Sequence, residues 1–246
     1  QMSNNIASEG AGMYFSSNSM NTLSNVLISD NVAFNEGGGI YSEEGSYSLI
    51  INSTIVNNNA WNDGAGLYIQ DVDEGPVIVN SIIWGNTLGE DEQSGVQQIS
   101  FDLDSDVHLY VLHSNIEAAY NNELGDWFTI EEGFEEDQVN FLESDFSLTN
   151  LDVDPLFSNP GAGDYSLSFN SPCINTATAS ASFTNAGVLN AYLDISEEFD
   201  PLVGIDTFEG CAPDMGYIEF VGENTASDCA CPSNTEWSCM GCTDEE

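Results

Sequence analysis

The sequence predicts an all-β solenoid with a short disulfide-rich C-terminal tail. A Gly-rich hexapeptide recurs at a spacing of 27 residues, beginning at Glu9, Glu36 and Asp63. The segments between its copies are β-branched runs without helical periodicity. All six cysteines lie in the last third of the chain. Hydrophobic residues make up 41% of the 246 residues, which is enough for a folded core.

Each repeat is expected to contribute short strands separated by sharp corners. The runs 48–56 and 76–84 are rich in Val and Ile and are broken by polar turn residues. Gly supplies tight bends, and Asn tolerates the left-handed backbone conformation that a corner needs. A third copy realigns over 79–86 after one inserted residue, and a fourth, more divergent copy covers 108–116.

Stacking these units places equivalent side chains above one another. Ile28 and Ile55 are 27 residues apart and should share an apolar column. The same stacking predicts an amide ladder of Asn31, Asn58 and Asn86 and an aromatic ladder of Tyr14, Tyr41 and Tyr68. This arrangement is a parallel β-helix, with one coil per repeat and neighbouring coils covering each other's edges.

Two acidic, polar stretches interrupt the pattern. We expect a parallel β-helix over residues 1–222, with loop elaborations at about 88–106 and 117–150, and a Cys-rich tail over 223–246. The chain opens within a repeat, so we expect its ends to continue into a longer chain or to meet a neighbour.

Several short motifs resemble known proteins. The Gly-rich repeats resemble those of polymorphic outer-membrane proteins, which are right-handed parallel β-helices. The ordered motifs at 79–87, 154–157, 163–167, 171–174 and 214–216 resemble the C-terminal coils of exported β-helix surface proteins of Bacteroidetes-type bacteria. The resemblance covers the chain from Glu9 to Phe220 with gaps, and it implies an extracellular or cell-surface location. Because these motifs mark corners, they imply the fold more strongly than the function.

The cysteines indicate the oxidising environment of an exported protein. An even number of them, clustered in an acidic chain, favours disulfides. Cys173 and Cys211 stand apart from the others and form the natural pair. The remaining four also permit a zinc site, but their first spacing, Cys-x-Cys, is a poor geometry for zinc, so we favour disulfides of open connectivity. These four are Cys229, Cys231, Cys239 and Cys242.

The charge excludes whole classes of partner. The chain has 42 Asp and Glu and neither Lys nor Arg, giving a formal net charge of -42. It therefore lacks the basic side chains that dominate binding to nucleic acids and to anionic lipids. No apolar run has the length of a membrane span, so we expect no membrane insertion.

Bound cations would offset this charge. Asp102, Asp104 and Asp106 alternate along one face of an expected strand, and Asp152 and Asp154 repeat the spacing. Hard oxygen ligands suit calcium, which accepts irregular geometry. The alternative for any one pair is a solvated outer face. The sequence thus predicts calcium as a ligand, at these five residues.

Catalysis is not predicted. Polysaccharide lyases with this fold commonly use Arg or Lys as the base, and this chain has neither. Two carboxylates alone could support glycoside hydrolysis, but among 42 acids some pair will stand at a suitable distance by chance. His108 and His113 are interpreted as ordinary surface or ladder residues, because no Gly-x-Ser-x-Gly motif accompanies them. We therefore predict no catalytic residues and no enzyme.

These inferences favour an exported structural protein. Open ends of a solenoid invite stacking, so we expect a subunit that self-assembles end to end into an extracellular filament or surface fibre stabilised by divalent cations. The alternative is a monomeric adhesin or stalk that binds glycans through aromatics such as Trp84, Tyr110 and Trp127. A polysaccharide-active enzyme ranks third, because it requires a cleft lined by paired acids.

Overall fold

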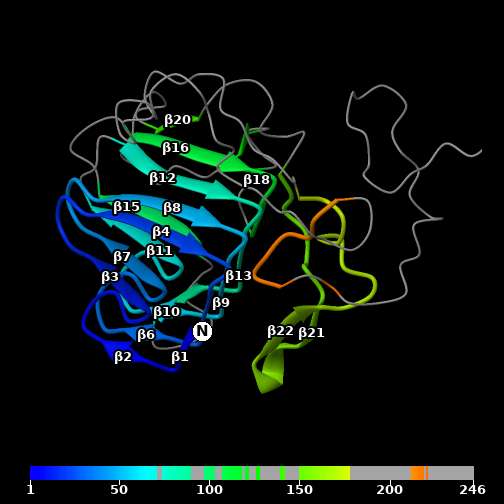
Figure 1. Cartoon of the computed structure of the whole chain (residues 1–246). Helices are drawn as coiled ribbons and strands as arrows, with labels where there is room; N and C mark the ends of the chain where they lie inside the picture. Colours follow the sequence, from blue (N-terminus) through cyan, green and yellow to red (C-terminus); the bar gives the residue numbers. More distant parts are fainter. Residues whose placement is uncertain are drawn as a thin grey trace, which may run out of the picture.

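The structure is a computed structural model that is built almost entirely of β-strands (Figure 1). The described residues are 1–70, 74–89, 97–102, 107–117, 120–121, 126–127, 139–141, 150–177, 212–218 and 220.

Four parallel sheets form a solenoid, and successive strands along the chain visit the four sheets in turn. The first sheet has the order β1 (Met2–Ser3), β5 (Leu27–Ser29), β9 (Thr54–Val56), β13 (Ile82–Trp84) and β17 (Asn115–Ile116). The second has the order β2 (Ile6–Ala7), β6 (Val32–Ala33), β10 (Asn59–Ala60) and β14 (Thr87–Leu88).

The third sheet has the order β3 (Met13–Phe15), β7 (Ile40–Ser42), β11 (Leu67–Gln70) and β15 (Ile99–Asp102). The fourth has the order β4 (Met20–Ser24), β8 (Tyr47–Ile51), β12 (Glu74–Val79), β16 (Val107–Leu112) and β20 (Val139–Phe141). One strand from each sheet makes a rung, and the first rung comprises β1 to β4. The predicted parallel β-helix is confirmed.

The register places the repeats above one another as expected. Ile28 pairs with Ile55, Ile55 with Ile83 and Ile83 with Ile116 along the first sheet. These four side chains are at most 1% exposed and form part of a single core cluster inside the solenoid. Small residues fill the second sheet instead, where Ala33 and Ala60 are fully buried. The described interior is therefore filled by buried side chains from rung to rung.

Each corner of the solenoid is turned by a column of residues with positive φ. The left-handed conformation costs little for Gly and is tolerated by Asn and Asp, which explains their recurrence in the sequence. The corner between the first two sheets carries Asn4, Asp30, Asn57 and Gly85, and the next corner carries Gly10, Gly37 and Gly64. The third corner carries Asn18 and Gly45, and the fourth carries Asn25, Asn52, Asn80 and His113.

Parts of both expected loop elaborations belong to the sheets. β15 lies within the first elaboration and pairs with β11, and the partly buried Ile99 and Phe101 pack on the core. Within the second elaboration, β20 pairs with β16. A short antiparallel pair is also present there, β18 (Tyr120–Asn121) with β19 (Asp126–Trp127). The interruptions are thus shorter than the polar composition suggested.

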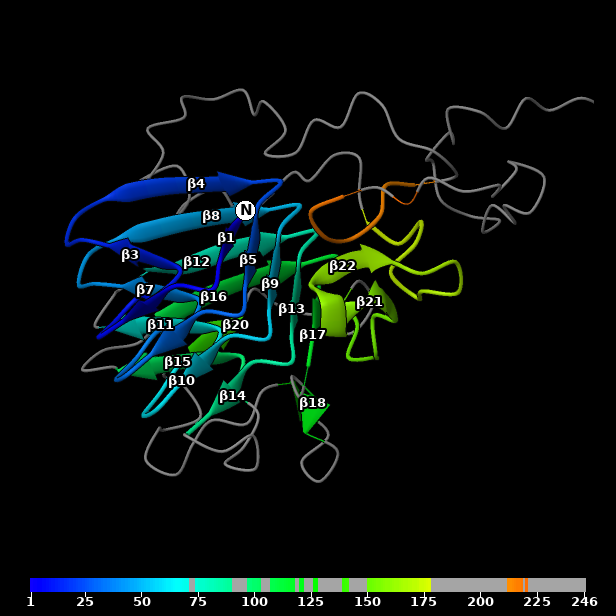
Figure 2. The same cartoon turned by 90° about the horizontal axis from the view of Figure 1, so that it is seen from below.

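The first sheet continues past β17 by one parallel bridge, Asn115 with Leu151, and an outer layer then follows. β21 (Phe157–Asn159), the 3-10 helix η1 (Pro160–Ala162) and β22 (Asp164–Leu167) form an antiparallel hairpin beside β13 and β17 (Figure 2). Tyr165 packs on Leu27 and Val56, and Leu167 packs on Ile82. The motifs at 154–157 and 163–167 therefore belong to a layer that covers the outer face of the first sheet, which is why Ile82 is fully buried although its side chain points out of the rung.

Candidate functional site: the N-terminal end of the solenoid

The predicted amide ladder runs through the buried interior. Asn31 Nδ2 donates to Asn58 Oδ1 over 2.8 Å, and Asn58 Nδ2 donates to Asn86 Oδ1 over 2.9 Å. Both acceptor oxygens also accept a backbone N–H from the preceding rung, which fixes the orientation of each amide. All three side chains are fully buried, so the ladder satisfies polar groups that would otherwise be costly.

The ladder is longer than the sequence predicted, and its bonds from side chain to side chain all run in the same direction. Asn5 Nδ2 donates to Asn31 Oδ1 over 2.8 Å at the first rung. At the other end Asn86 Nδ2 donates to Gln98 Oε1 over 2.6 Å, and Gln98 Nε2 donates to Glu117 Oε2 over 3.0 Å. Asn5 was detectable by its distance from Asn31, whereas Gln98 and Glu117 follow no repeat spacing.

Glu117 ends the ladder with a carboxylate in a partly buried position. Its Oε2 also accepts the Gly85 N–H over 2.7 Å. Burial raises the pKa of Glu117, the Gly85 hydrogen bond lowers it, and the nearby charges of Asp152 and Asp154 raise it further. The net effect is a raised pKa. The carboxylate accepts hydrogen bonds but cannot pass one on, so the ladder stops there.

The predicted aromatic ladder is also present. The rings of Tyr14 and Tyr41 stack with centroids 5.0 Å apart, and those of Tyr41 and Tyr68 lie 5.1 Å apart at a tilt of 36°. The Tyr41 hydroxyl donates to Gln70 Oε1 over 2.9 Å. Burial, followed by the charge of Glu9, raises the pKa of Tyr41 to about 12. This stack lies on the outside of the third sheet and links the first three rungs.

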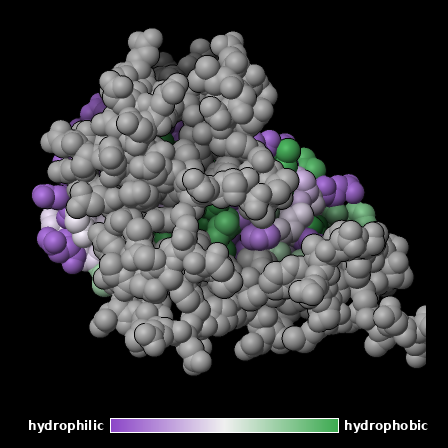
Figure 3. All heavy atoms as spheres, turned by 90° about the horizontal axis from the view of Figure 1, so that it is seen from above, coloured by the Kyte–Doolittle hydropathy of each residue, from purple (hydrophilic) through white to green (hydrophobic). Residues whose placement is uncertain are grey.

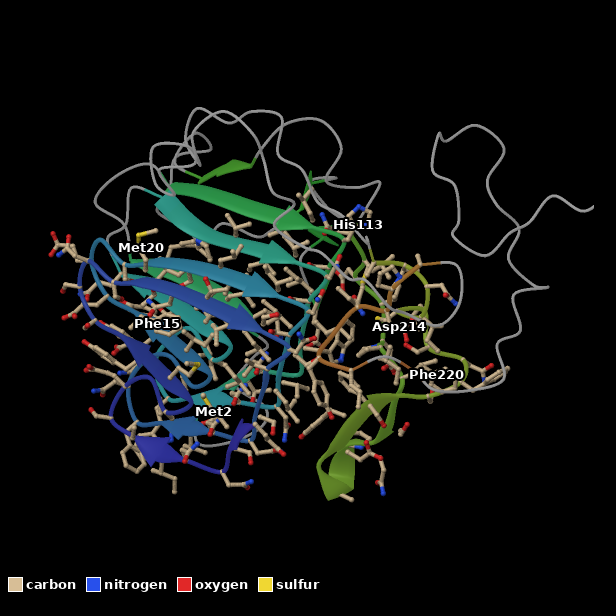
Figure 4. All side chains as sticks on the ribbon, in the orientation of Figure 1. Met2, Phe15, Met20, His113, Asp214 and Phe220 are labelled. Carbon is tan, nitrogen blue, oxygen red and sulfur yellow. The ribbon has the colours of Figure 1, made fainter. Side chains whose placement is uncertain are left out.

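The first rung leaves these columns open. Tyr14 is 46% exposed, whereas Tyr41 and Tyr68 are 6% and 7% exposed. Ile6 on β2 and Met20 on β4 are 68% and 59% exposed, and Met20 is labelled on the first rung in Figure 4. β1 to β4 are each at the edge of their sheet. We call this surface the N-terminal end, defined by Asn5, Ile6, Glu9–Gly12, Tyr14 and Met20.

Acidic side chains border the N-terminal end. Glu9, Glu36 and Asp63 occupy equivalent places in three rungs, and Glu36 pairs with Asp63 in a backbone bridge. Burial raises the pKa of Glu36, the hydrogen bond from Asn62 lowers it, and the charges of Glu9 and Asp63 raise it, for a net increase. In Figure 3 the described residues at the left are mainly hydrophilic, whereas hydrophobic and hydrophilic residues both reach the surface on the side of β21 and β22.

Three of the five predicted calcium ligands, Asp102, Asp152 and Asp154, belong to the described part of the chain. Asp102 ends β15, while Asp104 and Asp106 lie outside the described residues. Asp152 and Asp154 are described and influence the pKa of Glu117. Among the residues that the structure describes, no group of three His, Cys, Asp or Glu could hold a metal ion. The calcium sites stay a prediction.

Only one of the six cysteines is described. Cys173 is a free, fully buried thiol whose Sγ accepts a hydrogen bond from Asn115 Nδ2 over 3.2 Å. Burial raises the pKa of this thiol to about 11, so it is unreactive at neutral pH. Its expected partner, Cys211, and the four cysteines of the tail lie outside the described residues, so the disulfides stay predictions.

Comparison with known families fixes the type of solenoid. Residues 1–122 match the family model described as "Right handed beta helix region". The solenoid is a right-handed β-helix. No curated protein and no solved structure matched the chain. In the described part of this β-helix protein, no helix has the length and apolar character that a membrane crossing needs.

Proposed function

We propose that this β-helix protein is a structural subunit that associates end to end through its N-terminal end. The observation that carries the proposal is the contrast between the first rung and the next ones. Tyr14 is exposed where Tyr41 and Tyr68 are buried, Ile6 and Met20 are exposed beside it, and Asn5 begins an otherwise continuous ladder. Another rung placed there would cover apolar area and pair four strand edges at once.

The proposal also covers where this assembly is located and which ions favour it. The acidic composition and the motif resemblance support an extracellular or bacterial cell-surface filament or fibre. A formal charge of -42 opposes close contact between copies, so divalent cations such as calcium should favour association. The inference that the chain is not an enzyme rests on its lack of Lys and Arg.

A second candidate is a monomeric adhesin that binds a glycan. Phe34 and Trp61 support it, because both are exposed and their rings meet edge to face at 4.7 Å. Exposed aromatic rings can stack on sugars. Of the aromatics named from the sequence, Trp84 instead packs beneath the outer layer. The side chains of Tyr110 and Trp127 are not described.

Electron microscopy of the purified chain tests the structural proposal. Samples in millimolar calcium should show linear assemblies that shorten in a matched sample treated with chelator. Assemblies that persist after chelation would support the polymer and contradict a role for the cation in holding it together. Single particles in both samples would contradict the structural role, and glycan binding by Phe34 and Trp61 would then be tested with a Phe34→Ala, Trp61→Ala variant.

A further inference from the structure

The Gly-rich corner aligns its peptide groups along the solenoid. The N–H groups of Gly10, Ala11, Gly12 and Met13 donate to the four consecutive carbonyls of 36–39, over 2.9–3.2 Å. The N–H groups of 37–40 donate in the same way to the carbonyls of 63–66. Unlike a strand, in which successive N–H groups alternate in direction, this corner sends all of its donors toward the C-terminal rungs.

This alignment determines what the N-terminal end presents. No peptide bond in the described ranges is cis, and the C=O and N–H of one trans peptide point in opposite directions. The carbonyls of Glu9, Gly10, Ala11 and Gly12 therefore point out of the first rung. No described residue donates to them, although Gly10 and Ala11 are buried. In the two following rungs the equivalent carbonyls are all paired, and buried backbone acceptors normally are.

The amide ladder has the same polarity. Each amide donates from Nδ2 to the next side-chain oxygen toward the C-terminal rungs, and from Asn31 onward also to a backbone carbonyl of the preceding rung, so Asn5 Oδ1 is left at the N-terminal end with no donor among the described residues. The carboxylate of Glu9 adds a full negative charge beside the carbonyl row. In this corner, the N-terminal end therefore offers a row of backbone acceptors and no backbone donors.

The opposite end of the same column carries donors. The carbonyls of Gln97 and Gln98 accept from Gly66 and Leu67, so the N–H groups of Gln98 and Ile99 point toward the C-terminal end. No described residue accepts from these two groups. The aligned peptide dipoles thus make the N-terminal end the negative pole and the C-terminal end the positive pole of the column.

We propose that the N-terminal end docks in a parallel orientation on the C-terminal end of a second copy, and never on another N-terminal end. Two facing N-terminal ends would oppose one carbonyl row to the other and Glu9 to Glu9, with no proton to share between the two rows. A parallel copy continues the rung-to-rung pattern found inside the chain. The contact is heterologous, so the assembly is a polar chain of subunits.

This inference rests on the proposed end-to-end association and adds its direction. A mixing experiment separates the two claims. The double variant Ile6→Asp, Met20→Asp places charges on two exposed side chains of the N-terminal end without touching the ladder. It carries a C-terminal biotin-acceptor tag and is immobilised on streptavidin. Untagged wild-type chain is then added, and the retained amount is compared with that on tagged wild type.

Parallel docking predicts that the blocked variant retains about half as much wild-type chain as tagged wild type does, because one of its two ends still binds. Retention at background level on the variant, with strong retention on tagged wild type, would show head-to-head docking and overturn the inference alone. Background retention on both would overturn the end-to-end association as well. The tagged double variant Phe169→Asp, Ile218→Asp, whose exposed side chains lie in the outer layer, should behave like wild type.

Discussion

Asn58 occupies the centre of the amide ladder, where a single side chain satisfies groups from three rungs. Its Oδ1 accepts both the backbone N–H and the Nδ2 of Asn31, and its Nδ2 donates to Asn86 Oδ1 and to the carbonyl of Ile28. A smaller residue cannot make these hydrogen bonds. Because the groups around Asn58 are buried, they cannot bond to solvent instead. At the residue scale, the fold depends on side-chain amides that can be buried because they hydrogen-bond one another.

The change Asn58→Ala should therefore lower the free energy of unfolding by roughly 2–5 kcal/mol, because it strands buried donors of Asn31 and the Ile28 carbonyl. Urea denaturation followed by circular dichroism measures the effect. Asn5→Ala is the matched control: it removes the exposed first member of the same ladder and should cost about 1 kcal/mol or less. Equal losses for the two variants would contradict the account of the ladder.

Glu117 gives the ladder a pH dependence. Because burial raises its folded-state pKa, the folded state binds the proton more tightly than the unfolded state. The stability associated with this group is present below its unfolded pKa and is lost as pH rises through the raised folded pKa. Glu117→Gln keeps an oxygen for Gly85 and Gln98. Its melting temperature should be higher than that of wild type at pH 7 and close to that of wild type at pH 4. A variant that is less stable at pH 7 would contradict this assignment.

Much of the repeating part was predictable from sequence, for a physical reason. A solenoid repeats its environment at each rung, so Asn31, Asn58 and Asn86 meet the same constraint and recur with the period of the fold. The three stacked tyrosines follow the same rule. Gln98 and Glu117 continue the hydrogen-bonded ladder although they do not lie at the repeat spacing, because the insertion before β15 brings a longer amide to the ladder. No sequence pattern marks such a replacement.

At the scale of elements, corners decide how closely rungs can approach. A Cβ on Gly39 would lie 2.4 Å from the carbonyl oxygen of Gly66 and 2.9 Å from Ile55 Cγ2. The backbone there cannot withdraw, because Gly39 N–H and Ile40 N–H already bond the next rung. The Gly-rich hexapeptide is thus required by stacking. The outer layer lacks such a repeated constraint. The resemblance of its motifs to β-helix coils therefore does not reveal that β21 and β22 run antiparallel.

Gly39→Ala should reduce the free energy of unfolding by roughly 3 kcal/mol, since the methyl group forces the third sheet away from its neighbour. Gly161→Ala is the control, because a Cβ at this position meets no atom within 4 Å, and its effect should stay within about 0.5 kcal/mol. Thermal unfolding of both variants measures the difference. A neutral Gly39→Ala variant would show that the rungs tolerate a wider spacing.

At the scale of the whole molecule, charge and polarity act together. A chain with 42 acids and no Lys or Arg repels its own copies, so association needs a surface where attraction outweighs this repulsion. The N-terminal end combines exposed apolar side chains with unpaired strand edges and an aligned set of acceptors. The complementary surface is the C-terminal end, where the N–H groups of Gln98 and Ile99 have no acceptor among the described residues.

The most direct test of this central claim is sedimentation velocity over a range of concentrations in millimolar calcium. Wild-type chain should show a sedimentation coefficient that increases with concentration, as should the outer-layer variant Phe169→Asp, Ile218→Asp. The variant Ile6→Asp, Met20→Asp should remain monomeric over the same range while keeping its thermal stability, because both side chains are exposed. If wild type is monomeric throughout, or if the N-terminal variant associates as well as wild type, the N-terminal end is not an assembly surface.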